Sequence, residues 1–308
     1  MALPIDVREM IHSGTRLTEE RERPVRLMLL VEADAPDGLI DATEDALRPA
    51  TDFAALRIKL IEPDAEAVVY PGADAVIMLA GTASAGLGGA LVAARGLGVP
   101  VAVVGIGDDE YATSLGRILM HPTHDIVVRE SAAEALAGLG LWLAEMLPEK
   151  RLALAHNYAF MRRAVAEEAI RMTAAQNGII GAAAFFPGAD MPIMTANQGK
   201  MLLQIAAAYG QPLGVERMRE LVGVIGGGFV LRGVARQALA FVPFAGWAVK
   251  GGIGYAGTVA MGKAALTYFE EGGDLTAVRR RYAKRLSARR AALPAAEAVS
   301  TPEGGARA

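Results

Sequence analysis

The segment from Gln176 to Gly272 constrains the fold most strongly, because it is rich in Gly and Ala and almost free of charge. The longest uncharged run here, Met172–Ala189, spans 18 residues but contains Pro187, and the later runs are shorter still. A simple membrane-spanning helix needs about 20 apolar residues. Helices that are apolar on most faces must therefore pack against one another, against lipid, or against both.

Charge divides the chain of 308 residues into two unlike halves. Residues 1–150 hold 24 Asp and Glu against 12 Lys and Arg, a net charge of −12, whereas residues 151–308 hold 10 against 19, a net charge of +9. Either each half is simply solvated, or the basic and apolar half faces an anionic surface such as a bilayer. The chain has no cysteine, which excludes disulfides and thiolate sites. The charged first 24 residues predict no cleaved signal peptide.

The first half alternates between strand-like and helix-like runs. Strands rich in Val, Ile and Leu are expected at Val25–Glu32, Ala55–Ile61, Ala73–Ala80, Val99–Ile106 and Asp125–Arg129. Helices are expected at Gly38–Arg48, Gly86–Gly96, Glu110–Leu119 and Ser131–Leu147. This alternation predicts an α/β domain over residues 25–150, doubly wound around a parallel sheet, after an N-terminal extension over residues 1–24.

The apolar periodicity becomes helical from Arg151 onward. A buried stripe is expected at Leu154, Tyr158, Met161, Val165 and Ile170. Another helix is expected to end at Tyr209, with Asp190 or Thr195 as its N-cap, and further helices are expected over Gly214–Ala240 and Gly246–Glu271. We therefore expect an all-α apolar domain over residues 151–290 and a disordered tail, rich in Ala and Pro, over residues 291–308.

A phosphate-binding loop is missing after the first expected strand. Glu32, Asp34 and Asp37 stand where glycines and a Lys-Ser/Thr pair would be required, and their charges would oppose a triphosphate. The glycines Gly81 and Gly86 have the Walker spacing, but the Lys and Ser/Thr that hold phosphate and Mg²⁺ are absent after them. This segment is expected to be a structural turn, with a small-ligand loop as the alternative.

Asp108 and Asp109 follow the fourth expected strand, where ligands often bind in parallel sheets. A solvated acidic turn is the simpler interpretation, so Gly81, Gly86, Asp108 and Asp109 are only weak ligand candidates. No catalytic residue, cofactor or metal site is predicted, and His121 and His124 are expected to lie in a loop. The G-x-G-x-x-G sequence at Gly252–Gly257 lies in the helical half, where it indicates close helix packing and not dinucleotide binding.

Four ordered segments of the helical half carry a family resemblance. They are MTAAQ at 172–176, FPGADMPIMTANQGKMLLQIAAAYG at 186–210, ERMRELVGVIGGG at 216–228 and FVPFAGWAVKGGIGYAGTVAMGKAALTYFEEG at 241–272. Over residues 151–273 the chain resembles the domain of unknown function that follows Era-like GTPase domains and also occurs in YcjF-like inner-membrane proteins. The resemblance implies a preceding GTPase-like domain. Here VGIGDD at 104–109 stands in place of the N-K-x-D guanine motif, which implies a degenerate domain without hydrolysis.

The leading hypothesis is a non-catalytic adaptor or sensor that recruits a protein partner at the cytoplasmic membrane face. Residues expected to contact an anionic membrane or a partner are Phe185, Phe186, Phe244, Trp247, Arg279, Arg280, Arg281, Lys284 and Arg285. Nucleic acid is not an expected partner, because the chain is acidic, with a pI near 5.9. The alternatives are an enzyme that uses the carboxyl edge of the sheet and a soluble scaffold that forms a homo-oligomer.

Overall fold

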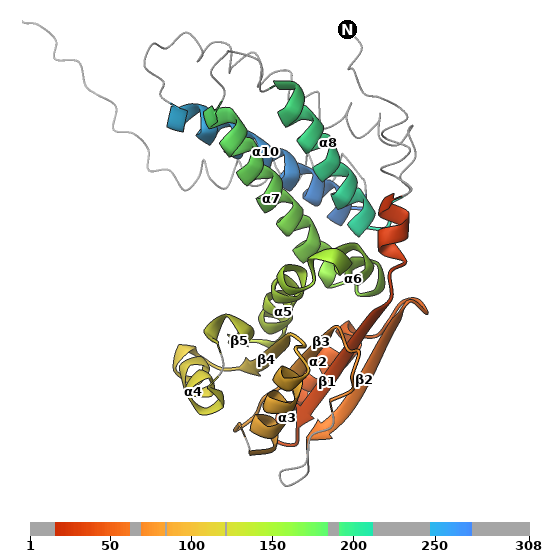
Figure 1. Cartoon of the computed structure of the whole chain (residues 1–308), viewed down its shortest axis with the longest axis vertical. Helices are drawn as coiled ribbons and strands as arrows, with labels where there is room; N and C mark the ends of the chain where they lie inside the picture. The colour runs from red at the N-terminus through yellow and green to blue at the C-terminus, as the bar shows by residue number, and fades with distance from the viewer. Residues whose placement is uncertain are drawn as a thin grey trace, which may run out of the picture. The chain divides into compact units, whose positions relative to one another are not determined.

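The computed structural model describes residues 16–61, 69–83, 85–120, 122–183, 191–211 and 247–272. A parallel sheet with helices makes up the part before residue 150, and the described residues after it are helical (Figure 1). This confirms the expected α/β class and the expected helical portion. The chain divides into two compact units after Leu266, so the sheet and the helices up to that residue belong to one unit.

The sheet is five-stranded, with the strand order β2-β1-β3-β4-β5. Its strands are β1 (Val25–Glu32), β2 (Ala54–Ile61), β3 (Ala75–Leu79), β4 (Val101–Ile106) and β5 (Ile126–Arg129). All neighbouring strands are parallel. The expected strands match these bounds to within two residues. Strands β1, β3 and β4 are buried on both faces and therefore require nearly continuous apolar runs.

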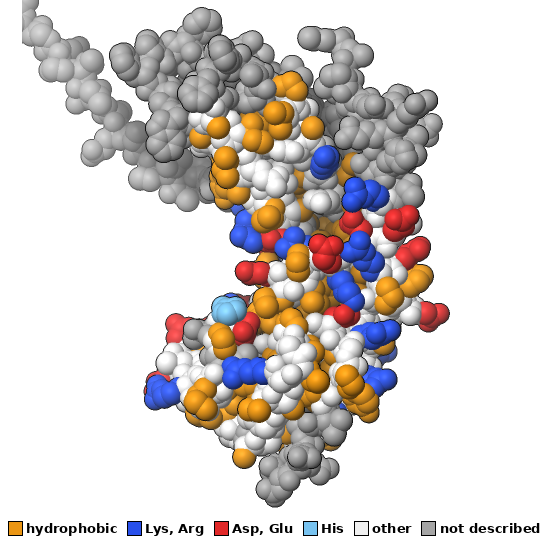
Figure 2. Space-filling model, viewed as in Figure 1, with side chains coloured by type: hydrophobic (Ala, Val, Ile, Leu, Met, Phe, Trp, Pro, Cys, Tyr) orange, Lys and Arg blue, Asp and Glu red, His pale blue; other side chains and the backbone are white. Residues whose placement is uncertain are grey.

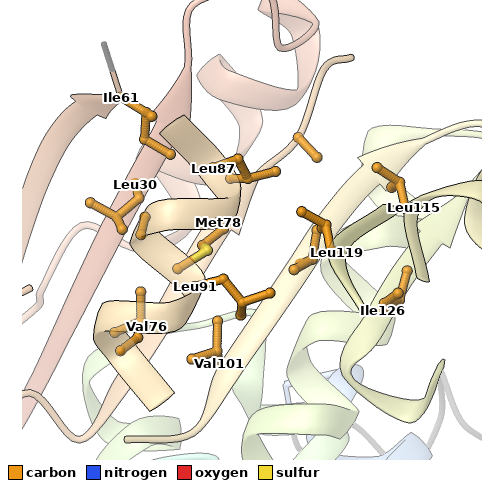
Figure 3. Packing of buried hydrophobic residues seen from close by; sticks show 14 of the residues in the cluster. Leu30, Ile61, Val76, Met78, Leu87, Leu91, Val101, Leu115, Leu119 and Ile126 are labelled. Carbon is orange, nitrogen blue, oxygen red and sulfur yellow. The ribbon is translucent and has the colours of Figure 1, made fainter. Parts of the chain in front are cut away.

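Both faces of the sheet are covered by the helices α2 (Asp37–Ala46), α3 (Ala85–Gly96), α4 (Asp109–Leu119) and α5 (Ala132–Met146). Figure 3 shows one core, in which Leu87 and Leu91 of α3 and Leu115 of α4 pack with alternate strand residues such as Met78. On the other face α5 contacts β4, β5 and α2. The intervening strand residues, Leu29 and Ile77 among them, are fully buried there.

A short 3₁₀ helix, η1 (Thr123–Asp125), precedes β5, and a second, η2 (Pro148–Lys150), leads into the helical portion. That portion contains α6 (Arg151–Asn157), α7 (Met161–Ala183), α8 (Met191–Ala208) and α10 (Trp247–Glu270). The predicted stripe is buried in full, but the chain leaves the helix between α6 and α7 around Tyr158. Thr195 lies inside α8, so the prediction that it is an N-cap is wrong. The predicted helix 214–240, the tail 291–308 and most of the extension 1–24 lie outside the described residues.

Among the described helices, none combines the length and the apolar character that crossing a bilayer requires.

Glycines let α10 approach α7 closely. A methyl group added at Gly254 would lie 2.7 Å from the backbone oxygen of Asn177, and one at Gly251 would lie 2.8 Å from that of Gly178. Gly252 and Gly257 have open space where a side chain would stand. The G-x-G-x-x-G sequence therefore lies within a helix, as expected, and its central glycine serves packing.

A buried polar network joins α7, α8 and α10. The amide of Asn177 donates to the hydroxyl of Thr258 at 3.0 Å, and the amide of Gln198 donates to the same hydroxyl at 3.1 Å. Asn197 donates to the side-chain oxygen of Asn177 at 3.1 Å. Asn177 and Thr258 are fully buried, so each lost bond would leave a desolvated polar group. The network therefore fixes the positions of α7, α8 and α10 relative to one another.

The helical portion is attached at the amino ends of the strands. The buried Asn157 accepts hydrogen bonds from the amide and hydroxyl of Thr51, which precedes β2, at 3.2 and 2.6 Å. Lys150 forms an ion pair of 2.6 Å with Asp74, which precedes β3, and donates to the backbone oxygen of Pro24 at 2.7 Å. The carboxyl ends of the strands take no part in these bonds.

The close approach of α10 to α7 predicts opposite effects at two glycines of the same helix. Gly254→Ala should destabilise the fold by about 1–3 kcal/mol, because a backbone oxygen cannot move away from the new methyl group. Gly257→Ala should be neutral or stabilising by up to about 1 kcal/mol through helix propensity. Chemical denaturation followed by circular dichroism measures both free energies of unfolding. Equal effects at the two positions would contradict the described packing.

Candidate functional site

The candidate site is the carboxyl edge of the sheet between β1 and β3. The chain leaves β1 toward β2 on one side and later returns to β3 on the other, so the strand order reverses between β1 and β3. In open parallel sheets ligands bind at this point, in the crevice outside the strand ends. Here β1 ends at Glu32 and leads into Asp34, and Gly81–Ala83 lie in the loop after β3.

The carboxylate of Glu32 binds the backbone of the loop after β3. Its Oε2 accepts hydrogen bonds from the N–H of Gly81 at 2.8 Å and of Ala83 at 3.2 Å. Glu32 is only 1% exposed, so these donors replace hydrogen bonds that water would otherwise provide. Successive backbone N–H groups of this kind form an anion-binding nest, and here the anion is a side chain of the same protein.

Asp34 binds Thr82, the loop residue between Gly81 and Ala83. Its Oδ2 accepts from the amide of Thr82 at 3.0 Å and from the hydroxyl of Thr82 at 2.5 Å. The hydroxyl bond is the main cause that lowers the pKa of Asp34 below its ordinary value of 3.8. The donors of three consecutive residues, Gly81 to Ala83, are thus directed at two carboxylates.

The backbone of this loop is shaped around those carboxylates. A side chain at Gly81 would collide with Asp34, including its backbone oxygen at 2.6 Å, so only glycine fits there. Ala83 has φ of +61°, a left-handed conformation that costs a non-glycine residue about 1–2 kcal/mol. The bond from its N–H to Glu32 offsets part of that strain.

Tyr111 fills the neighbouring part of the edge. Its ring lies over Gly105 and Gly107, where an added side chain would approach the ring to 2.9 and 2.5 Å. Its hydroxyl donates to the backbone oxygen of Gly81 in a short hydrogen bond. Burial, followed by the charges of Glu32 and Asp34, raises the pKa of Tyr111 to about 12, so the phenol stays protonated and remains a donor.

The structure does not gather the four weak ligand candidates, Gly81, Gly86, Asp108 and Asp109, at one point. Gly81 lies in the occupied loop, whereas Gly86 is buried within α3. Asp108 is the N-cap of α4, where its Oδ1 accepts from the amide of Tyr111 at 2.9 Å, and Asp109 is the first residue of that helix. Asp108 and Asp109 are both exposed, and Asp108 caps the helix; their weak candidacy as ligands stays a prediction.

Tyr111 is the residue that sequence reasoning missed. The available signal was the pair Gly105 and Gly107 at the end of β4, since two glycines beside a strand end leave a space that a large side chain must fill. Of the expected membrane or partner contacts, Phe185, Phe186, Phe244 and Arg279–Arg285 lie outside the described residues. Trp247 begins α10, but its side chain is also outside the described part.

Two cavities lie away from this edge. One of about 360 Å³ is at the amino end of β4, lined by residues that include Arg95, Val101 and Met120. The other, of about 290 Å³, is lined by α6, α7 and α8 and includes Arg151 and Lys200. Within the described ranges, no three His, Asp or Glu side chains are grouped closely enough to hold a metal ion.

Comparison of the chain with protein-family models, with curated proteins and with solved structures found no match.

The Asp34–Thr82 contact predicts a pH-dependent loop. Because the folded pKa of Asp34 is lowered, its stabilising contribution is fully present above 3.8 and is lost as the pH falls through the lower folded value. The amide resonance of Thr82, followed by NMR, should therefore titrate with a midpoint below pH 3.8. Thr82→Val, which removes the hydroxyl donor, should raise that midpoint toward 3.8, and Asp41→Asn should leave it unchanged. A wild-type midpoint at or above 3.8 is incompatible with the contact.

Proposed function

We propose that this protein is a non-catalytic adaptor, in which a degenerate GTPase-like α/β domain is joined to a helical part that associates with the cytoplasmic face of a membrane. One observation carries the first half of this proposal. The edge where a nucleotide phosphate would bind is occupied by the carboxylates of Glu32 and Asp34 and by Tyr111. A phosphate would have to displace both carboxylates and would meet their charge.

The strand order supports the finer description of the α/β domain. The order 2-1-3-4-5, with all strands parallel, is one of the common doubly wound orders. The first strand leads into Glu32 and Asp34 where a working GTPase would have a glycine-rich loop, and the space beside Gly105 and Gly107 holds a tyrosine ring. These features favour a domain that keeps the architecture of a nucleotide-binding sheet without its chemistry.

The surface of the helical part supports membrane association. Three contacting stretches hold no charged residue: 172–183 of α7, 191–199 of α8 and 251–262 of α10. Large apolar side chains on them are exposed, among them Ile179 at 69% and Ile193 at 54%. Figure 2 shows this uncharged surface over α7 and α8, in the upper part of the view. An exposed apolar patch of this kind marks a surface that meets lipid or another protein.

Further determinants adjoin these stretches in the sequence. Phe185 and Phe186 lie between α7 and α8, and the basic segment Arg279–Arg290 follows α10; both are outside the described residues. Basic residues near a bilayer contribute roughly 1 kcal/mol each on anionic lipid and favour the cytoplasmic side. Lys250 and Lys263 bound the uncharged stretch of α10, so we propose peripheral or hairpin-like association. The resemblance to the Era-associated, YcjF-like family rests on the ordered sequence segments within residues 151–273 and is part of the proposal.

The occupied edge predicts that GTP with Mg²⁺ does not bind. Isothermal titration of the full chain should show no saturable heat up to millimolar nucleotide, which corresponds to binding weaker than about −4 kcal/mol. Glu32→Gln should behave in the same way, because removing one charge does not create the missing Lys and Ser/Thr. Saturable binding of the wild type near 1 μM, about −8 kcal/mol, would falsify the non-catalytic proposal and favour the enzyme alternative.

The uncharged helical surface predicts binding to lipid vesicles. The full chain should float with vesicles that contain phosphatidylglycerol. The double change Ile179→Glu and Ile193→Glu should weaken binding more than tenfold, because two apolar contacts worth about 1.5–3 kcal/mol each when buried are replaced by charges. Ile118→Glu, on an equally exposed residue of α4 at 56%, is the matched control and should bind as the wild type does.

The basic segment is tested in the same assay. Replacing Arg279, Arg280, Arg281, Lys284 and Arg285 with Gln should weaken binding to anionic vesicles and remove most of its salt dependence. If the wild type stays with the soluble fraction as a stable oligomer and the Ile179→Glu, Ile193→Glu variant becomes monomeric, the surface is an interface between copies. That result would replace the membrane proposal by the scaffold alternative.

A further inference from the structure

The strand β2 forms one edge of the sheet and is unusually accessible. It pairs with β1 on one side, and in the part of the chain that the structure describes no strand pairs with its other side (Figure 1). Most of its side chains are exposed on both faces, with only Ile61 fully buried. Such an edge offers a row of backbone N–H and C=O groups to a further strand.

The exposed side chains of β2 alternate between two kinds. Arg57 and Lys59 stand beside Met28 and Leu30 in the register with β1 and share their face of the sheet. Ile58 and Leu60 lie on the opposite face, and 49% and 65% of their surfaces are exposed. A strand added at this edge would therefore meet cations along one of its faces and apolar side chains along the other.

Arg57 is held in position at this edge. Its guanidinium lies over the ring of Tyr70, with the guanidinium carbon 4.0 Å from the ring centre. The side chain of Tyr70 is itself 44% exposed. A stacked arginine loses less side-chain freedom on binding a carboxylate than a free one, which favours a planar, bidentate contact.

The charges of Arg57 and Lys59 determine which kind of strand can pair with the free edge of β2. Two copies of β2 that pair antiparallel about a two-fold axis at Arg57, Ile58 or Lys59 would place cations opposite one another, and an axis between Arg57 and Ile58 would place them opposite apolar side chains. Like charges directly opposite one another destabilise a strand pair, and a cation opposite an apolar side chain gains no partner, so a second copy is disfavoured in both cases. The same cations attract carboxylates from a strand of different sequence.

We infer that the β2 edge binds an extended acidic segment of a partner protein by strand addition. In this segment Asp or Glu alternates with Val, Ile or Leu, so that the carboxylates meet Arg57 and Lys59 while the apolar side chains cover Ile58 and Leu60. Backbone hydrogen bonds supply the pairing, and the alternation supplies the specificity. The inference deepens the proposed adaptor role, on which it rests for the existence of a partner, by giving that partner's chemistry.

The test uses a fluorescein-labelled peptide of eight residues in which glutamate and valine alternate. Fluorescence anisotropy with the full chain should give a Kd of about 10–100 μM at low salt. The variant Arg57→Glu, Lys59→Glu should bind this peptide at least tenfold more weakly, and it should gain binding to the matched peptide in which lysine replaces glutamate. An acidic peptide that is N-methylated at every residue should not bind, because it has no backbone N–H to donate from either of its edges.

Each outcome bears on the inference. No binding of the acidic peptide by the wild type, equal binding by the charge-reversed variant, or full binding of the N-methylated peptide would overturn it. Binding of the lysine peptide by the charge-reversed variant would show that the variant is folded and that the edge of β2 is still accessible. The nucleotide titration and the vesicle assay involve no peptide, so failure of this inference is distinguishable from failure of the proposed function.

Discussion

The bond between the Glu32 carboxylate and the loop after β3 is the interaction on which the α/β domain depends. The Glu32 carboxylate is 1% exposed, and it accepts hydrogen bonds from the N–H groups of Gly81 and Ala83. Hydrogen bonds to a buried acceptor are costly to lose, at about 1–3 kcal/mol. The same bond holds the loop in its left-handed turn at Ala83 and closes the edge where parallel sheets bind ligands.

Closing that edge changes what the domain can do. Tyr111 completes it by covering Gly105 and Gly107 and donating to Gly81, so that the loop donors and the neighbouring space are both used internally. The edge strand β2, with its exposed Ile58 and Leu60, remains accessible to a partner. The proposed recognition along β2 rests on this accessible edge.

The helical portion is organised by a different constraint. Its helices are held by small residues that permit backbone contact and by the polar network around Asn177 and Thr258. Buried apolar residues such as Ile170 and Met194 pack in these contacts as well, whereas Ile179 and Ile193 lie on the outside. These exposed apolar side chains are the physical basis for expecting a lipid or protein surface there.

Local patterns determined much of this protein from the sequence alone. Runs of Val, Ile and Leu located β1 to β5, and the helical period located the buried stripe from Leu154 to Ile170, since both signals reside in neighbouring residues. The acidic residues after β1 also indicated that no phosphate loop follows it. These inferences required no knowledge of which strands lie side by side.

Tertiary structure alone decided the rest. Glu32 meets Gly81 across 49 positions of sequence because β1 and β3 are adjacent, and Tyr111 reaches Gly81 because β3 and β4 are adjacent. The break between α6 and α7 at Tyr158 likewise accompanies the bond of Asn157 to Thr51, 106 positions away. Alternation of strands and helices predicts the elements but not their order in space, and contacts between distant residues depend on that order.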